Sequence, residues 1–161
     1  MREYEAVVFD MDGVIFDSEK KVVECWQVLA DKYGFTGIEE ACRACLGTTK
    51  EKSKEIMLQR YGEDFPYETY SAEASKLFHE RYDGGRLPKK TGIEKILQAL
   101  SQEGKKIALA SSTRRQTVES QLREAGLIGY FDKIICGDMV EKSKPEPDIY
   151  IRACKELGVL P

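Results

Sequence analysis

The stretch that decides the fold is Ala6-Val7-Val8-Phe9-Asp10-Met11-Asp12-Gly13. Its first four residues form a short, continuous apolar run, which is typical of a strand buried on both faces of a parallel sheet. Asp10 and Asp12 follow that run, and Gly13 lets the chain turn sharply. Because ligands of parallel α/β sheets bind beyond the carboxyl ends of the strands, this stretch predicts a buried strand that delivers two carboxylates to a binding edge.

The next part of the chain carries a helical pattern and no strand pattern. From Ser18 to about Arg81, apolar residues recur at steps of three and four, and glycines interrupt them. The pattern predicts four successive helices, at residues 18–33, 39–46, 50–61 and 67–82. These helices form a helical block inserted after the first strand.

Beyond Gly85, predicted helices alternate with predicted strands. Thr91 and Glu94 fit a capping box at the start of a helix. The buried face of that helix is predicted to hold Ile93, Ile96, Leu97 and Leu100. Further on, the pattern predicts strands at 106–110 and 133–136 and helices at 116–125 and 148–157. The whole order predicts an α/β fold: a Rossmann-like parallel sheet with helices on its faces, interrupted by an α-helical insertion.

Composition excludes several classes of function. The chain has 161 residues and a net charge of −3, with no basic stripe, so we expect no nucleic-acid partner. It has no apolar run of about 18 residues, so we expect no membrane span. The amino-terminal residues are too acidic for a secretory signal, which predicts a cytoplasmic protein. The odd number of cysteines, five, favours reduced thiols, and we interpret the CxxC of Cys42 and Cys45 as small apolar residues on a helix face.

Polar residues follow all three predicted strands. The second strand ends in Ser111, Ser112 and Thr113, and Lys144 follows the third. Each feature alone has an ordinary explanation, such as a helix cap or a surface lysine. Their occurrence in order, at three successive strand ends, favours a shared site.

The residue types at these strand ends suit phosphoryl transfer. Two carboxylates as close as Asp10 and Asp12 repel each other, and a divalent cation relieves the repulsion. Oxygen ligands favour Mg²⁺ over zinc. One carboxylate can attack phosphorus while the other protonates the leaving oxygen. Ser111 can donate to a phosphoryl oxygen, and Lys144 balances the negative charge.

These motifs resemble those of the haloacid dehalogenase superfamily, in particular its β-phosphoglucomutase-like subfamily. The segment from Asp10 to Val14 looks like the first motif, Ser111 at the end of KIALAS looks like the second, and Lys144 in SKPEPDIY looks like the third. The helical block falls where that subfamily carries its cap domain. The resemblance therefore implies a core of residues 1–15 and 86–161 and a cap of residues 16–85.

The resemblance also implies a role for each site residue. Asp10 becomes a transient aspartyl phosphate, and Asp12 is the general acid and then the general base. Ser111, Ser112 and Lys144 hold the phosphoryl group, and Mg²⁺ binds to the Asp10 carboxylate and the Asp12 main-chain oxygen. We expect a Mg²⁺-dependent phosphatase that acts on a small phosphorylated metabolite, such as a sugar phosphate.

The sequence departs from the family pattern at its carboxyl end, where the fourth, acidic motif is missing. We expect a chain truncated before the last strands of the core, with weak Mg²⁺ binding and little activity of its own. The first strand would then be an exposed edge. The alternative is an inactive assembly module whose first strand pairs with a partner. For the full-length protein we expect a monomer.

The choice between phosphatase and mutase stays open, with the phosphatase favoured. The resemblance implies a Thr and a His near the first cap helix of β-phosphoglucomutases, where this chain has Phe16 and Lys20. Lys50, in the loop Gly47-Thr48-Thr49-Lys50, is the candidate for contacting the non-reacting end of the substrate. The alternative is that Thr49 caps a helix and Lys50 is simply solvated.

Overall fold

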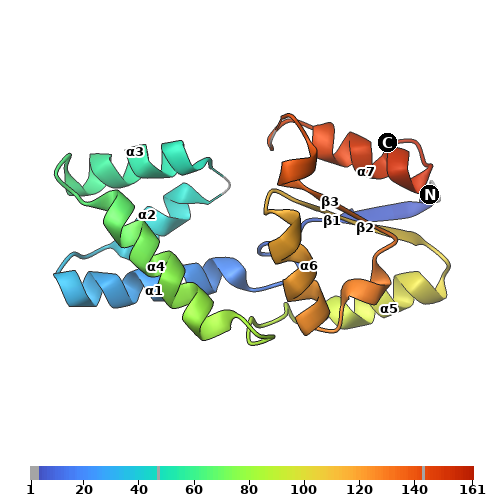
Figure 1. The fold of residues 1–161 in the computed structure, drawn as a ribbon, viewed down its shortest axis with the longest axis horizontal. Helices are drawn as coiled ribbons and strands as arrows, with labels where there is room; N and C mark the ends of the chain where they lie inside the picture. Colours follow the sequence, from blue (N-terminus) through green and yellow to red (C-terminus); the bar gives the residue numbers. More distant parts are fainter. Residues whose placement is uncertain (1–3, 47, 143) are drawn as a thin grey trace. The chain divides into compact units, whose positions relative to one another are not determined.

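A computed structural model describes residues 4–46, 48–142 and 144–161 of the chain (Figure 1). Gly47, in the predicted cap loop, and Ser143, in the third motif, lie outside the described residues. The chain divides into two compact units, one made of the residues up to Asp17 together with Gly84–Pro161, and the other of Ser18–Asp83. We call them the sheet unit and the helical unit and describe each by itself.

The sheet unit contains a parallel sheet of three strands. They are β1 (Ala6–Phe9), β2 (Lys106–Ser111) and β3 (Lys133–Cys136), and the order across the sheet is β1-β2-β3. Phe9 pairs with Leu109, and Ser111 pairs with Cys136, so the strands end at a common edge. The predicted α/β fold with a parallel sheet is confirmed. Within the described residues β1 is an edge strand, as expected, and its side chains are half-buried.

Three helices cover the two faces of this sheet. In Figure 1, α7 (Asp148–Leu157) lies on one face, and α5 (Ile93–Gln102) and α6 (Arg115–Glu124) lie on the other. Short 3₁₀ turns, η1 (Ile128–Tyr130) and η2 (Gly137–Met139), flank β3. The core beneath α7 consists of Ala108, Ala110, Ile135, Ile149, Ala153 and Leu157. Since strand side chains alternate, Ile107 and Leu109, both fully buried, point to the opposite face.

The predicted capping box of α5 is wrong. The N-cap residue is Gly92, with a φ of 88°, and no side chain caps the helix. Glu94 instead forms an ion pair of 2.5 Å with Lys89. The predicted buried face is also partly wrong, because Ile96 is 48% exposed. A glycine that readily adopts a positive φ can close the preceding turn without a side-chain cap, which makes the capping box unnecessary.

The helical unit contains the four predicted helices. They are α1 (Ser18–Tyr33), α2 (Ile38–Cys45), α3 (Lys50–Tyr61) and α4 (Tyr67–Tyr82). Their core contains Trp26 stacked on Tyr67, with 6.1 Å between ring centroids. The CxxC cysteines belong to this core: Cys42 is buried and Cys45 packs against it. Burial raises the pKa of the Cys42 thiol to about 12, which agrees with the interpretation as an apolar residue.

No helix in the described part of the chain is both long enough and apolar enough to cross a membrane.

Candidate active site

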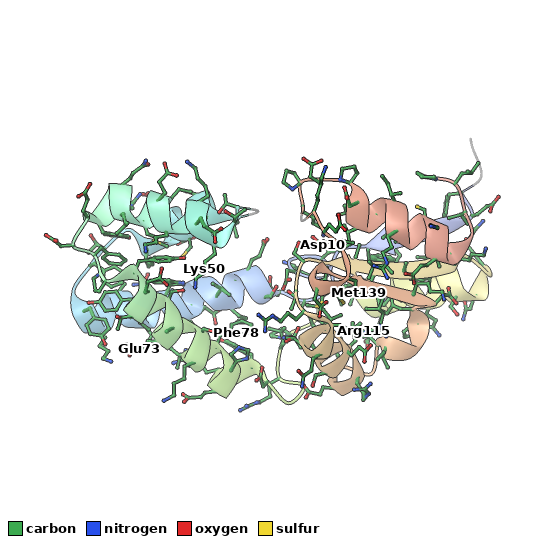
Figure 2. The ribbon with its side chains drawn as sticks, turned by 45° about the horizontal axis from the view of Figure 1, so that its top comes forward. Asp10, Lys50, Glu73, Phe78, Arg115 and Met139 are labelled. Atoms are coloured by element: carbon green, nitrogen blue, oxygen red, sulfur yellow. The ribbon has the colours of Figure 1, made fainter. Side chains whose placement is uncertain are left out.

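An ion pair at the carboxyl edge of the sheet joins the first and third predicted motifs. Asp10 follows the last residue of β1, and its Oδ1 lies 2.9 Å from Nζ of Lys144 (Asp10 is labelled in Figure 2). The same Oδ1 accepts a hydrogen bond of 2.7 Å from the amide of Met11. The Asp10 side chain is 38% exposed, so the ammonium group and the amide fix one carboxylate oxygen while solvent still reaches the group. An oriented, accessible carboxylate is what a nucleophile requires.

Lys144 is held in place by groups from two other elements. Its Nζ donates a hydrogen bond of 2.9 Å to the main-chain oxygen of Ala110 in β2, and it lies 5.1 Å from the centroid of the Tyr150 ring in α7. Burial lowers the pKa of the Lys144 ammonium, but its hydrogen bonds with Asp10 and Tyr150 outweigh that effect and leave the pKa above its ordinary value. Lys144 therefore carries a fixed positive charge beside Asp10. The contribution of Tyr150 was not predicted from the sequence.

Asp12 lies on the turn that follows β1. Gly13 has a φ of 72°, and the amides of Val14 and Ile15 both donate to the main-chain oxygen of Met11, at 3.3 and 2.8 Å. This tight turn keeps the half-buried Asp12 at the carboxyl edge. The hydroxyl of Thr113, just beyond β2, donates to Oδ2 of Asp12 at 3.3 Å. The first two predicted motifs therefore meet through Thr113.

Ser111 ends β2 and is fully buried. Its Oγ accepts a hydrogen bond of 3.1 Å from the amide of Thr113. The neighbouring Ser112 is exposed, and its main chain lies directly against Gly137 of η2. A Cβ atom added to Gly137 would lie 2.3 Å from the Ser112 carbonyl oxygen, so only a glycine fits there. The close approach of η2 to the end of β2 gives no local sequence signal, since it depends on the packing of β2 beside β3.

Two further residues beside the site shape it without an obvious chemical role. Asp138, in η2, accepts hydrogen bonds from the amide of Arg115 at 3.2 and 3.3 Å and so caps α6 from outside that helix (Arg115 is labelled in Figure 2). Burial, together with the nearby Asp138, raises the pKa of the Cys136 thiol to about 11. A thiol with that pKa stays protonated near neutral pH, so Cys136 is a poor competitor for the role of nucleophile.

The predicted residue Lys50 belongs to the helical unit, at the first turn of α3 (Figure 2). Thr49 caps this helix, because its Oγ1 accepts from the amide of Lys52 at 3.2 Å. The Lys50 side chain is 69% exposed and lies 3.5 Å from a carboxylate oxygen of Glu68, which also pairs with Lys54 at 3.1 Å. Lys50 is thus an exposed cation that shares one carboxylate with a second lysine.

The sequence model of the haloacid dehalogenase-like hydrolase family matches residues 7–161 of the chain. The chain belongs to this family. The predicted resemblance is therefore confirmed, and the Asp10–Lys144 pair lies within the matched part of this hydrolase.

The similar proteins include both phosphatases and mutases. The chain is 31% identical over 162 residues to the phosphorylated carbohydrates phosphatase of Thermotoga maritima, covering 98% of this chain and 72% of that protein. It is 32% identical over 165 residues to the beta-phosphoglucomutase of Bacillus subtilis, covering 98% of this chain and 71% of that protein. The crystal structure of CbbY from Rhodobacter sphaeroides, in complex with phosphate, matches with a TM-score of 0.68 at 28% identity, covering 98% of this chain and 74% of the other. The relatives of this haloacid dehalogenase-like chain thus include a phosphatase and a phosphoglucomutase.

Proteins of this kind generally use a divalent metal ion, and the donors in the sheet unit fit one. The Asp10 carboxylate and the main chain around Asp12 offer only oxygen atoms at the carboxyl edge of the sheet, which suits a hard cation. In the described part of the chain, no group of three or more His, Cys, Asp or Glu side chains could hold a metal. Mg²⁺ commonly binds through one or two carboxylates and completes its shell with water and substrate phosphate, so a small donor set is compatible with it.

Proposed function

We propose that the chain is a Mg²⁺-dependent phosphatase that transfers the phosphoryl group of a small phosphorylated metabolite, a sugar phosphate, through Asp10 to water. The observation that carries the proposal is the 2.9 Å pair between Asp10 and Lys144 at the end of β1, with Asp12 two residues further on. This pair combines an oriented carboxylate nucleophile with a positive charge that a phosphoryl group requires. Bound Mg²⁺, held by the Asp10 carboxylate and the Asp12 main-chain oxygen, would neutralise charge on the transferring phosphoryl oxygens.

In the first step, the Asp10 carboxylate attacks phosphorus and the bond to the leaving oxygen breaks. Asp12 donates its proton to that oxygen, and the sugar leaves as a neutral alcohol. Lys144 lies 2.9 Å from Asp10, so its positive charge attracts the phosphoryl group as this group approaches the nucleophile. The Ser111 hydroxyl accepts from the amide of Thr113, so its own proton is available to a second phosphoryl oxygen.

In the second step, water attacks the phosphorus of the aspartyl phosphate. Asp12, now ionised, takes a proton from the water, and the bond between Asp10 and phosphorus breaks to release inorganic phosphate. Both carboxyl groups then have their starting protonation states, so the cycle is complete.

The helical unit is proposed to be the cap that the family resemblance implies, with the sheet unit as the core. Lys50 is the proposed contact for the non-reacting end of the substrate, since it is an exposed cation on this unit. Because Lys50 and Lys54 pair with the same Glu68 carboxylate, the charge of Lys50 is only partly neutralised. We further propose a monomeric, cytoplasmic enzyme.

A phosphosugar mutase of the β-phosphoglucomutase type is the second candidate, because a relative that carries this name is 32% identical. Phe16 favours the phosphatase. The resemblance implies a polar Thr at this position in mutases, whereas Phe16 is 1% exposed and packs as a core residue.

The test uses the complete natural gene product with p-nitrophenyl phosphate and a panel of sugar phosphates, with Mg²⁺ and with EDTA. We expect phosphate release that requires Mg²⁺ and is lost in Asp10→Asn, while Asp31→Asn, an exposed carboxylate on α1, keeps full activity. Conversion of glucose 1-phosphate to glucose 6-phosphate without net phosphate release would identify the mutase instead. A protein inactive towards every substrate with Mg²⁺ present would refute both and favour the assembly module.

A further inference from the structure

Thr113, in the loop after β2, contacts the proposed general acid Asp12 through its side chain. Its Oγ1 donates to Oδ2 of Asp12 at 3.3 Å. This distance is long for an O–H···O hydrogen bond. Hydrogen bonds of catalytic groups are often long without substrate and tighten when it binds.

The main chain of Thr113 is fixed on both sides. Its amide donates to Oγ of Ser111 at 3.1 Å, and its carbonyl oxygen accepts from the amide of Gly137 at 3.2 Å. These bonds tie the residue to the ends of β2 and β3, the two strands that pair at Ser111 and Cys136. A β-branched side chain has few χ1 rotamers, so a fixed main chain also restricts where the Thr113 hydroxyl can point.

We propose that Thr113 is a positioning residue: its hydroxyl holds one oxygen of Asp12 and so directs the other oxygen, with its proton, to the leaving group. This inference rests on the proposed function of Asp12 as general acid. A carboxylic acid that rotates freely about its last bond presents its proton to the leaving oxygen only part of the time. A hydrogen bond to Oδ2 restricts this rotation. The carboxyl group is then already oriented towards the leaving oxygen before the reaction begins, which lowers the activation free energy.

The leaving group provides a test that separates positioning from a structural role. The p-nitrophenolate ion leaves without a proton, whereas the alkoxide of a sugar requires one, so only the sugar phosphate depends on the general acid. The ratio kcat/KM covers the reaction up to departure of the leaving group and excludes the later hydrolysis step, in which Asp12 acts as base. The comparison of kcat/KM for the two substrates therefore isolates the acid role.

Thr113→Val keeps the shape of the side chain and removes its hydroxyl. We expect kcat/KM to fall about tenfold for the sugar phosphate and less than about twofold for p-nitrophenyl phosphate, the size expected for one hydrogen bond to a polar partner. Thr113→Ser restores the hydroxyl and should recover most of the loss. Thr117→Val makes the same replacement four residues later, within α6, and is the matched control. It should leave kcat/KM unchanged for both substrates.

A double-mutant cycle with Asp12→Ala completes the test. Without the Asp12 carboxyl group, Thr113→Val should have no further effect on the ratio between substrates, since the two residues act as one unit. Equal losses on both substrates, or no loss, in an active and folded Thr113→Val enzyme would overturn the inference while leaving the proposed function intact. A wild-type protein inactive on every phosphate ester would refute the proposed function, and the inference would fall with it. Thermal unfolding of each variant identifies any that do not fold. If Thr113→Val does not fold, Thr113→Ala, which also lacks the hydroxyl, decides through the same comparison of the two substrates.

Discussion

Gly137 takes no part in the chemistry, but the main chain packed against it leaves no room for a side chain. It is not among the glycines with positive φ, so alanine can adopt its backbone conformation. Alanine does not fit in the available space. Its Cβ would lie 2.3 Å from the Ser112 carbonyl oxygen and 2.9 Å from the carbonyl carbon, whereas real Cβ contacts stay above 3.0 Å. The difference, 3.0 less 2.3, requires a movement of about 0.7 Å. Because the contacting atoms are main chain, no flexible side chain can absorb it.

We predict two consequences of Gly137→Ala. Forcing an extra methyl into a packed region costs about 1–3 kcal/mol of unfolding free energy. The movement of Ser112 also displaces Thr113, whose oxygen accepts from the Gly137 amide at 3.2 Å. Since a misplacement of about 1 Å at an active site can cost about a hundredfold in rate, a shift of this size should lower kcat by about ten- to thirtyfold.

Gly129 offers a matched control for this substitution. It also lacks a positive φ, and a Cβ added to it meets nothing within 4 Å. Gly129→Ala should therefore keep its activity and change the unfolding free energy by less than about 0.5 kcal/mol. The assays are urea unfolding and steady-state release of phosphate from a sugar phosphate, the substrate that depends on the general acid. If Gly137→Ala were as stable and as active as Gly129→Ala, the close approach of η2 to the end of β2 would be refuted.

Three more predictions address other parts of the chain. Asp138→Ala should lower the unfolding free energy by about 1 kcal/mol in urea unfolding, since α6 loses the carboxylate that caps the Arg115 amide, and an unchanged value would show that water replaces the cap. Lys50→Ala should raise KM for sugar phosphates several-fold but not for p-nitrophenyl phosphate, whereas Lys54→Ala, which removes the other partner of Glu68, should change neither; equal effects would count against a substrate contact. The pKa of Cys42 rises from 9.0 to about 12 on folding, so the folded state holds this proton more tightly, and the resulting stability is complete below pH 9 and lost as the pH rises towards 12. Urea unfolding at pH 8 and pH 10 should therefore show a smaller decline for Cys42→Ala than for wild type, and identical declines would contradict a buried neutral thiol.

The elements of the fold were predictable wherever local chemistry and tertiary packing agree. The run Ala6–Phe9 is apolar throughout because strand β1 has side chains on two covered faces, and a glycine such as Gly34, with a φ of 76°, ends its helix as the sequence indicates. The start of α5 was mispredicted because Thr91 and Glu94 satisfy the local rule, while Lys89 draws Glu94 away in the folded chain. A local sequence pattern does not show that Lys89 competes with the helix terminus for the Glu94 carboxylate.

Much of the site was predictable for a different reason, which is that each strand ends in its own polar residues. What the sequence could not indicate is which of those residues touch. The sequence places Thr113 at a strand end without indicating a role for it, and it contains no signal that singles out Tyr150. Their contacts with Asp12 and Lys144 join segments that the sheet, and not the local sequence, brings together.

The pairing register of β1 with β2 determines how the motifs come together in the candidate site. Phe9 lies opposite Leu109, so Asp10, the first residue after β1, lies level with Ala110, which is still part of β2. Lys144 can therefore bind the Asp10 carboxylate and the Ala110 oxygen at once, each at 2.9 Å. A slip of one residue would move Asp10 by about 3.3 Å along the strand and turn its side chain to the other face, which would break the shared contact. The same slip would take the side chains of Ala6 and Val8 away from the core beneath α7. The packing that stabilises the sheet therefore also specifies the register in which the candidate nucleophile meets its lysine.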